Sequence, residues 1–236
     1  MSIAENIVQV RQAIGAACER AGRSERDVAL MAVSKTHPAA ALREAYAAGI
    51  RLFGENKVQE FQQKSAELAE MHGAQFALIG HLQSNKAAKA AELFHAIHAV
   101  DSLKLAERLN AAALKLGKTL TVLIEVKLSS EESKHGISPG AINEILHATP
   151  LLPALDVRGL MTVPPFFDDP EEARPYFRQL RELRNSLAAV HPQSPLPELS
   201  MGMSHDFAVA IEEGSTCVRI GTAIFGVRDY AAQNPA

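Results

Sequence analysis

Short apolar runs alternate with longer amphipathic segments along most of the chain. The apolar runs have the length of strands, and we expect strands at Ala29–Ser34, Arg51–Phe53, Phe76–Ile79, Ala96–Val100, Thr121–Val126, Asp156–Leu160, Glu198–Ser200 and Cys217–Ile220. The segments between them are typical of helices, which we expect at Ala39–Ala48, Val58–Met71, Ala87–Phe94, Leu103–Leu116, Ala141–Ala148, Pro170–Val190 and Asp206–Glu213. A further helix, Ile3–Ala21, is expected before the first strand. Strands that alternate with helices predict βαβ units and a parallel sheet.

Eight strand–helix units in 236 residues predict an α/β fold of the TIM type, a (β/α)8 barrel with an extra N-terminal helix. Pro and Gly are scattered singly and no linker stands out, so residues 1–236 are expected to form a single domain. The alternative is an open doubly wound sheet. That fold usually carries a glycine-rich turn after its first strand, whereas this chain has Ser34–Pro38 there.

Composition and charge exclude several classes of protein. Hydrophobic residues make up 47% of the chain and charged residues 22%, the balance of an ordinary soluble globular protein. A net charge of −3 without a basic tract argues against nucleic acid as a partner, and the apolar runs are too short to cross a membrane. Glu5 stands where a secretory signal would carry positive charge, and Cys18 and Cys217 have no paired spacing. We therefore expect a cytoplasmic protein with two free thiols.

Polar residues follow directly after each apolar run. They are Lys35, Gly54–Asn56, Gly80–His81, Asp101, Lys127, Thr162, Ser200–Ser204 and Gly221–Thr222. Barrel proteins place their working groups at the C-terminal ends of the strands. The chemistry of this chain is therefore expected on one rim of the barrel.

Lys35 comes directly after the first expected strand and has two interpretations. In the plainer one, its ammonium reaches solvent past the end of the strand. In the other, partial burial favours the neutral amine, which can form a Schiff base with an aldehyde.

The loops after the last two strands favour the second interpretation. Ser200–Ser204 leads into the helix expected from Asp206, so that Ser204 can cap the helix and Gly202 allows close approach of the backbone. Gly221 and Thr222 follow the eighth strand, and these two loops form the usual phosphate site of barrels. Two ordinary caps and a tight turn are the plainer alternative. Together with Lys35, the loops indicate a phosphorylated aldehyde, and pyridoxal 5′-phosphate (PLP) is the cofactor of that kind.

Arg219 lies within the last expected strand, two residues before Gly221. The plainer interpretation is an ion pair with a carboxylate inside the barrel. The interpretation that we favour is that its guanidinium faces the pyridine nitrogen of PLP. An arginine there disfavours protonation of the ring and weakens its capacity to withdraw electrons.

Segments from the first strand to the last resemble the pyridoxal phosphate homeostasis family of PLP-binding barrel proteins. They are Ala32–Thr36, Phe53–Glu60, Ile79–Lys86, Glu131–Ile137, Arg158–Pro165 and Leu199–Gly226, of which the last is the most specific. The resemblance implies a barrel like the N-terminal domain of alanine racemase, with PLP bound as a Schiff base. It also implies a role in intracellular PLP homeostasis or carriage, without catalysis.

The resemblance further implies which residues contact the cofactor. Lys35 is the Schiff-base lysine, Ser200, Ser204, Gly221 and Thr222 surround the phosphate, Arg219 faces the ring nitrogen, Asn56 lies near the ring and its phenolic oxygen, and Met201 lines the pocket. The chain departs from the family pattern at His37, at Phe76–Gly80, at Lys127 and at His205. These departures concern the rim of the site more than the main pocket.

The tyrosines favour a binder over an enzyme. A PLP racemase needs a base on each face of the ring or one mobile base. In two-domain alanine racemases the second base is a tyrosine, and a separate domain supplies it. Here the expected barrel takes up nearly the whole chain, and Tyr46, Tyr176 and Tyr230 fall in expected helices or in the tail.

Two kinds of enzyme remain as alternatives. One is a small PLP-dependent racemase or lyase of amino acids, with Lys35 as one base and His81 or His205 opposite. The other is a phosphosugar aldolase, which is less favoured because its Schiff-base lysine usually lies on a later strand.

The remaining signals concern metals and partners. His95 and His98 lack a third ligand, so no metal is expected. Lys134, in a charged loop, is a candidate to attract the anionic cofactor as it enters or leaves. The expected partners are PLP and, as recipients, PLP-requiring apo-enzymes, with no nucleic acid or membrane, and a monomer is expected.

Overall fold

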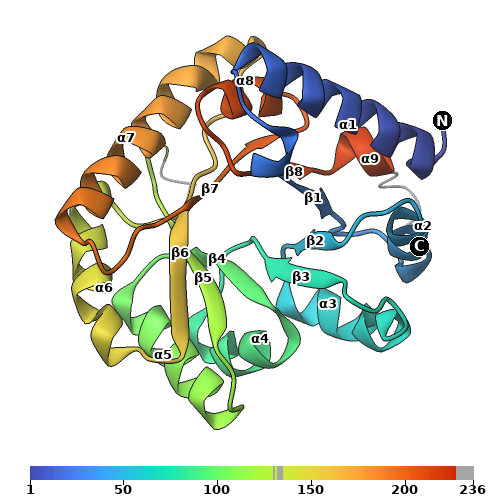
Figure 1. Ribbon diagram of the computed structural model, residues 1–236. Coiled ribbons are helices and arrows are strands. Elements are labelled where there is room, and N and C mark those ends of the chain that lie inside the picture. Colours follow the sequence, from blue (N-terminus) through green and yellow to red (C-terminus); the bar gives the residue numbers. More distant parts are fainter. Residues whose placement is uncertain (130, 132–134, 227–236) are drawn as a thin grey trace.

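The computed structural model describes residues 1–129, 131 and 135–226. Its strands form a closed barrel in which neighbours follow chain order and every pair is parallel (Figure 1). The strands are β1 (Ala29–Val33), β2 (Leu52–Glu55), β3 (Gln75–Leu78), β4 (Ala96–Val100), β5 (Leu120–Glu125), β6 (Leu155–Met161), β7 (Glu198–Met203) and β8 (Cys217–Ile220). The expected parallel barrel of the TIM type is confirmed.

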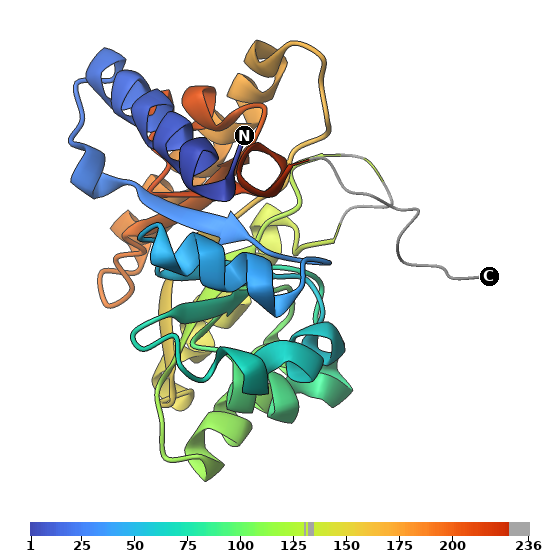
Figure 2. The same ribbon diagram turned by 90° about the vertical axis from the view of Figure 1, so that its right-hand side faces the viewer.

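Helices cover the outside of the barrel in both views (Figures 1 and 2). They are α1 (Ile3–Arg20), α2 (Ala39–Ala47), α3 (Val58–Ser65), α4 (Ala87–Leu93), α5 (Leu103–Lys115), α6 (Ile142–Ala148), α7 (Arg174–Val190), α8 (Phe207–Glu212) and α9 (Thr222–Phe225). The sequence missed α9, and it extended α3 over the 3₁₀ turn Ala66–Leu68. It also ended the seventh strand at Ser200, whereas β7 continues to Met203.

The extra N-terminal helix has a local and a tertiary cause. The Ser2 hydroxyl accepts a hydrogen bond from the Glu5 N–H, and the Glu5 carboxylate accepts one from the Ser2 N–H, which is a capping box. The residues buried on α1 recur every three or four positions: Ile7, Val10, Ile14, Ala17 and Cys18. With this face α1 packs against α8 and α9 (Figure 1). The helix therefore supports the elements that follow β7 and β8.

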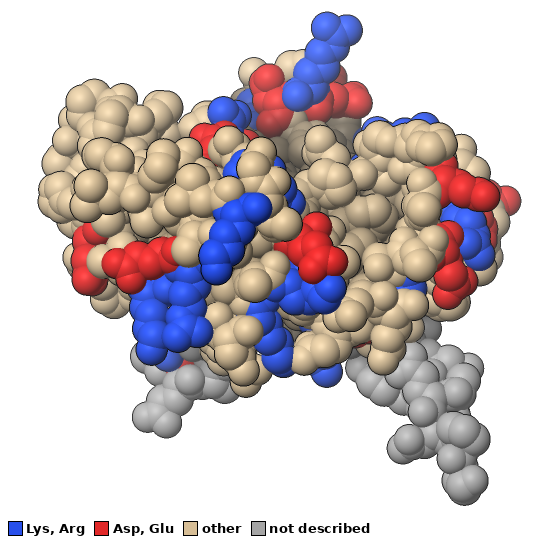
Figure 3. Space-filling model, turned by 90° about the horizontal axis from the view of Figure 1, so that it is seen from below, with Lys and Arg blue, Asp and Glu red and all other residues tan. Residues whose placement is uncertain are grey.

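Surface charge and helix length are the two features that bear on possible partners. On the face seen from below in Figure 1, acidic and basic side chains are intermixed, and neither sign covers the surface (Figure 3). Within the described ranges, no helix has both the length and the apolar character needed to cross a membrane.

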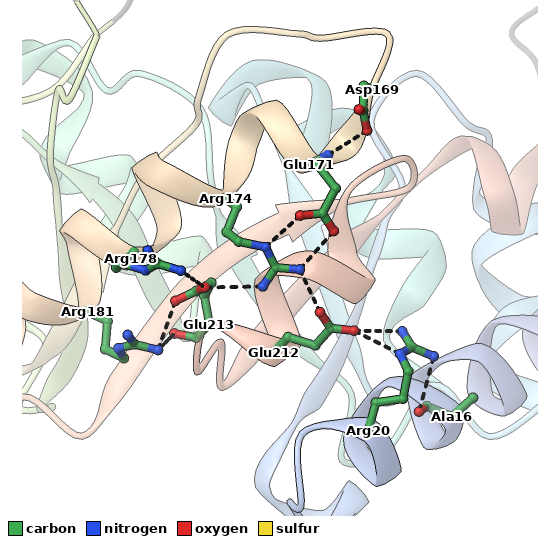
Figure 4. Close-up of polar contacts among 9 residues, drawn as sticks. All are labelled: Ala16, Arg20, Asp169, Glu171, Arg174, Arg178, Arg181, Glu212 and Glu213. Atoms are coloured by element: carbon green, nitrogen blue, oxygen red, sulfur yellow. Dashed lines mark hydrogen bonds and ion pairs between the residues drawn. The ribbon is translucent and has the colours of Figure 1, made fainter.

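A cluster of arginines and glutamates joins α7, α8 and α1 (Figure 4). The carboxylate of Glu213, next to the end of α8, lies 3.1 Å from Arg174, 3.0 Å from Arg178 and 2.9 Å from Arg181. Glu212 joins Arg174, at 2.7 Å, to Arg20 of α1, at 2.9 Å. Burial alone would raise the pKa of Glu213, but the arginines around it outweigh this effect, so the pKa is lowered from its usual value. The arginines of α7 thus hold α8 against its neighbours.

Replacing the buried acid should loosen this contact. Because the Glu213 side chain is only 5% exposed, Glu213→Gln should lower the free energy of unfolding by about 2 kcal/mol, measured by urea denaturation. Glu182→Gln, on the exposed face of α7, is the matched control and should change it by less than about 0.5 kcal/mol. Equal effects of the two substitutions would contradict a stabilising role for the cluster.

Candidate functional site

A cavity of about 340 Å³ opens at the C-terminal ends of the barrel strands. Its lining residues are Val33, Lys35, Asn56, Ile79, Val163, Phe166, Met203, Ser204, His205, Arg219, Gly221 and Thr222. Six of the eight residues that the family resemblance assigns to the cofactor are among them: Lys35, Asn56, Ser204, Arg219, Gly221 and Thr222. The other two, Ser200 and Met201, are fully buried and do not line it.

Lys35 follows β1 in a loop whose backbone is hydrogen-bonded by a second lysine, Lys64. The ammonium of Lys64, on α3, donates hydrogen bonds to the carbonyl oxygens of Ser34, at 3.0 Å, and His37, at 3.2 Å. It also forms a buried ion pair of 2.8 Å with Glu55, at the end of β2. Lys64 therefore fixes the backbone on both sides of Lys35.

Ser204 joins the loops that follow β7 and β8. Its Oγ accepts hydrogen bonds from the N–H groups of Gly221, at 3.2 Å, and Ala223, at 3.4 Å. The expectation that Ser204 caps the next helix was wrong, because Asp206 occupies the N-cap position of α8. The Asp206 carboxylate accepts from the Met203 N–H at 2.6 Å, which leaves Ser204 turned toward β8.

Gly202 allows the close approach that the sequence suggested. Its φ is +93°, and a Cβ at this position would lie 2.6 Å from the Cβ of Ala210 on α8. The pairing of β7 with β8 shifts register between Ser200 and Met203. This irregularity lets Met203 line the cavity while Ser200 lies inside the barrel.

Arg219 is only 3% exposed, yet it lines the cavity. Its Nη1 donates to the Ser200 hydroxyl and its Nη2 to the Thr162 carbonyl, each at 2.8 Å. Within the described part of the chain, no carboxylate lies within ion-pair distance of it, so the plainer interpretation of Arg219 was wrong. Burial lowers the pKa of Arg219, although Asp206 and Glu125 oppose this.

Glu125, at the end of β5, is a buried acid close to this arginine. Burial and the charge of Asp101 raise its pKa to about 7, against the effect of Arg219. Its Oε2 has no hydrogen-bond partner among the described residues. The acid is therefore only partly ionised near neutral pH.

The mouth of the cavity includes Phe166, which the sequence did not place there, and His205, which it named as a candidate base. Phe166, 72% exposed, lies with its ring 5.4 Å from that of His205. His205 Nε2 donates a hydrogen bond of 2.9 Å to the Asp168 carbonyl. This contact ties the loop after β6 to the loop after β7.

Other candidate residues lie elsewhere. His81 is hydrogen-bonded to Asp101 at 3.1 Å and does not line the cavity. Neither Tyr46 nor Tyr176 lines it, and Tyr230 and Lys134 lie outside the described residues. In the ranges that the structure describes, no group of three or more His, Cys, Asp or Glu side chains could hold a metal ion.

The chain is similar to known proteins over almost its whole length. The family model for the alanine racemase N-terminal domain matches residues 3–229. The pyridoxal phosphate homeostasis protein of Aquifex aeolicus is 45% identical over 230 residues, which are 98% of this chain and all of the relative. That of Pseudomonas aeruginosa is 46% identical over 231 residues, 98% of each chain.

A solved structure shows the same similarity. PipY of Synechococcus elongatus, with PLP bound, is 43% identical and has a TM-score of 0.86, over 95% of this chain and 100% of that one. The family model's match, residues 3–229, includes every residue that lines the cavity. This chain therefore belongs to the alanine racemase N-terminal domain family, among the pyridoxal phosphate homeostasis proteins.

Proposed function

We propose that this protein binds PLP as a Schiff base with Lys35 and serves in PLP homeostasis, as a carrier and not as an enzyme. The observation that carries the proposal is one cavity with three kinds of group around it. An amine comes from Lys35, a buried guanidinium from Arg219, and hydroxyl and backbone donors from Ser204 and the Gly221–Thr222 turn. These match the aldehyde, the ring nitrogen and the phosphate of PLP.

The donor set supports PLP in particular. Among the described residues, the buried guanidinium is bonded to neutral acceptors alone, which suits a neutral pyridine nitrogen that accepts a hydrogen bond. Ser204 accepts from two backbone N–H groups, so its own proton is available to a phosphate oxygen. Asn56, across the mouth, has an amide that can donate to the phenolic oxygen.

When bound, PLP would supply an aldehyde carbon and an aromatic ring that can withdraw electrons. The chain's own residues limit that chemistry. Arg219 would face the ring nitrogen and would disfavour its protonation, which would weaken electron withdrawal. Lys64 holds the backbone around Lys35 in place. The arrangement supports binding and exchange better than turnover.

A racemase or lyase is the second candidate, and His205 is the residue that favours it. His205 lines the cavity, where it could act as a base opposite Lys35. Its Nε2 is the donor to Asp168, however, so that nitrogen carries a proton already. No tyrosine among the described residues lines the cavity.

We further propose that PLP-requiring apo-enzymes are the recipients and that the protein acts as a monomer in the cytoplasm. This chain by itself supplies the amine, the guanidinium and the groups at the phosphate end, so the proposed site needs no second copy, which supports the monomer. Two buried, free cysteines, Cys18 and Cys217, support a reducing compartment.

The visible absorption spectrum tests the Schiff base. Protein supplied with PLP should show the absorption band of a lysine Schiff base, and Lys35→Ala should lose or shift it, because no other amine is expected at that place. Lys104→Ala, an exposed lysine of α5, is the control and should keep the band. Added L-alanine should be neither racemised nor deaminated. Loss or scrambling of alanine would support the enzyme, and no band in the wild type would contradict PLP binding.

Ser204→Ala tests the phosphate end. A hydrogen bond to a charged group contributes about 1.5–3 kcal/mol, so the Kd for PLP should rise about tenfold or more. The Kd for pyridoxal, which lacks the phosphate, should stay within about twofold. Titration followed by absorbance gives both constants. An equal loss for the two ligands would mean that Ser204 does not contact the phosphate.

A further inference from the structure

Ser200 lies inside the barrel, although the family resemblance assigns it to the phosphate. It is fully buried on β7, and its Oγ accepts a hydrogen bond of 2.8 Å from Arg219 on β8. The same oxygen lies 3.3 Å from Nδ1 of His98, on β4. Since β4 and β7 are not neighbours in the barrel, the three side chains form a hydrogen-bonded chain across its interior.

The Arg219 end of this chain is fixed at two points. One terminal nitrogen donates to Ser200 and the other to the Thr162 carbonyl at the end of β6. Two bonds on different nitrogens fix both the plane and the position of a rigid guanidinium. Both acceptors are neutral, so the direction of the group depends on geometry and not on a carboxylate.

The His98 end is neutral. Burial and the nearby charge of Arg219 lower the pKa of His98 to about 3. A neutral imidazole has one nitrogen that accepts, and Ser200 can donate its hydroxyl proton to Nδ1 while its oxygen accepts from Arg219. The hydrogen-bonded groups Arg219, Ser200 and His98 therefore keep one protonation state over the pH range in which most proteins work.

His98 is also reachable from the opposite end of the barrel. A cavity of about 420 Å³ opens at the N-terminal ends of the strands, and His98 and Cys217 are among its lining residues. The small side chains of Ala29, Ala77 and Ala96, in β1, β3 and β4, line it as well. A molecule as small as imidazole can thus approach the place of the His98 ring without passing Lys35.

We propose that Ser200 and His98 are positioning residues, which hold the Arg219 guanidinium where it meets the ring nitrogen of PLP, and that Ser200 does not bind the phosphate. This inference rests on the proposed function. It assigns Ser200 and Ser204, four residues apart in one motif, to opposite ends of the cofactor. Supporting groups of this kind lock a binding residue in its productive geometry.

The first arm of the test uses the protein without cofactor. Nitrogen-15 NMR should find His98 neutral from about pH 5 to about pH 8. Ser200→Ala should speed exchange of the Arg219 guanidinium protons with water by about tenfold, because one bond is lost. Ser204→Ala, which removes no bond to Arg219, should leave this exchange unchanged.

The second arm compares PLP with pyridoxal. Ser200→Ala should weaken both ligands by the same factor, about tenfold, and should shift the absorption band of the bound cofactor. His98→Ala should shift the band in the same direction. Added imidazole should restore the wild-type band in His98→Ala, and it should have no effect on Ser200→Ala.

The outcomes separate the two proposals. A loss confined to PLP in Ser200→Ala would make Ser200 a phosphate ligand and overturn the inference. Unchanged Arg219 exchange, or a band in His98→Ala that imidazole cannot restore, would overturn it as well. The cofactor-free protein could give the NMR results expected for the hydrogen bonds among Arg219, Ser200 and His98 while the wild type takes up no PLP. The proposed function would then fail, and with it the role of these hydrogen bonds toward the cofactor.

Discussion

Pairing of β1 with β8 closes the barrel, and the site exists only because of that closure. The register sets Met31 opposite Arg219 and Ala32 opposite Ile220. Lys35 and the Gly221–Thr222 turn, which lie near opposite ends of the sequence, therefore leave the barrel side by side. All eight strands are parallel, so the other polar strand ends meet at the same rim. Helix α1 covers the outside of this closure by packing on α8 and α9.

Closure of the barrel also means that polar groups in its interior need hydrogen-bond partners there. Charged and polar groups inside a barrel lose their contact with water, and each needs a partner. Arg219 obtains two neutral acceptors, Ser200 and Thr162, and Glu125 responds to burial with a raised pKa. The result is a guanidinium that is held at two points while Arg219 still lines the cavity. An arginine held in this way suits a cofactor that is to be kept and released more than one that is to withdraw electrons.

Most of the fold could be predicted from the sequence, because the alternation of apolar runs and amphipathic segments is strong from Ala29 to Ile220. Lys35 and Arg219 could be identified for the same reason, since each stands at or near the end of an apolar run. The direction of Ser200 could not be predicted. It depends on the register shift in β7, which the Gly202 backbone makes possible and which no periodicity reveals.

The supporting residues of the site were the hardest to find. Lys64 follows Val58 and Phe61 at helical spacing on the buried face of α3, and a lysine at such a position is a signal that could have been used. His98 was considered only as a metal ligand, because its partner Ser200 lies on a distant strand. Phe166 follows two prolines in a loop, and nothing in its neighbourhood marks the mouth of a cavity.

The most direct test of the account is to trap the cofactor and find where it is attached. Borohydride reduces a Schiff base to a stable secondary amine, and peptide mapping by mass spectrometry then locates the modified lysine. The account predicts that protein incubated with PLP and reduced carries the adduct at Lys35. An adduct at another lysine with Lys35 unmodified, or no adduct at all, would contradict it.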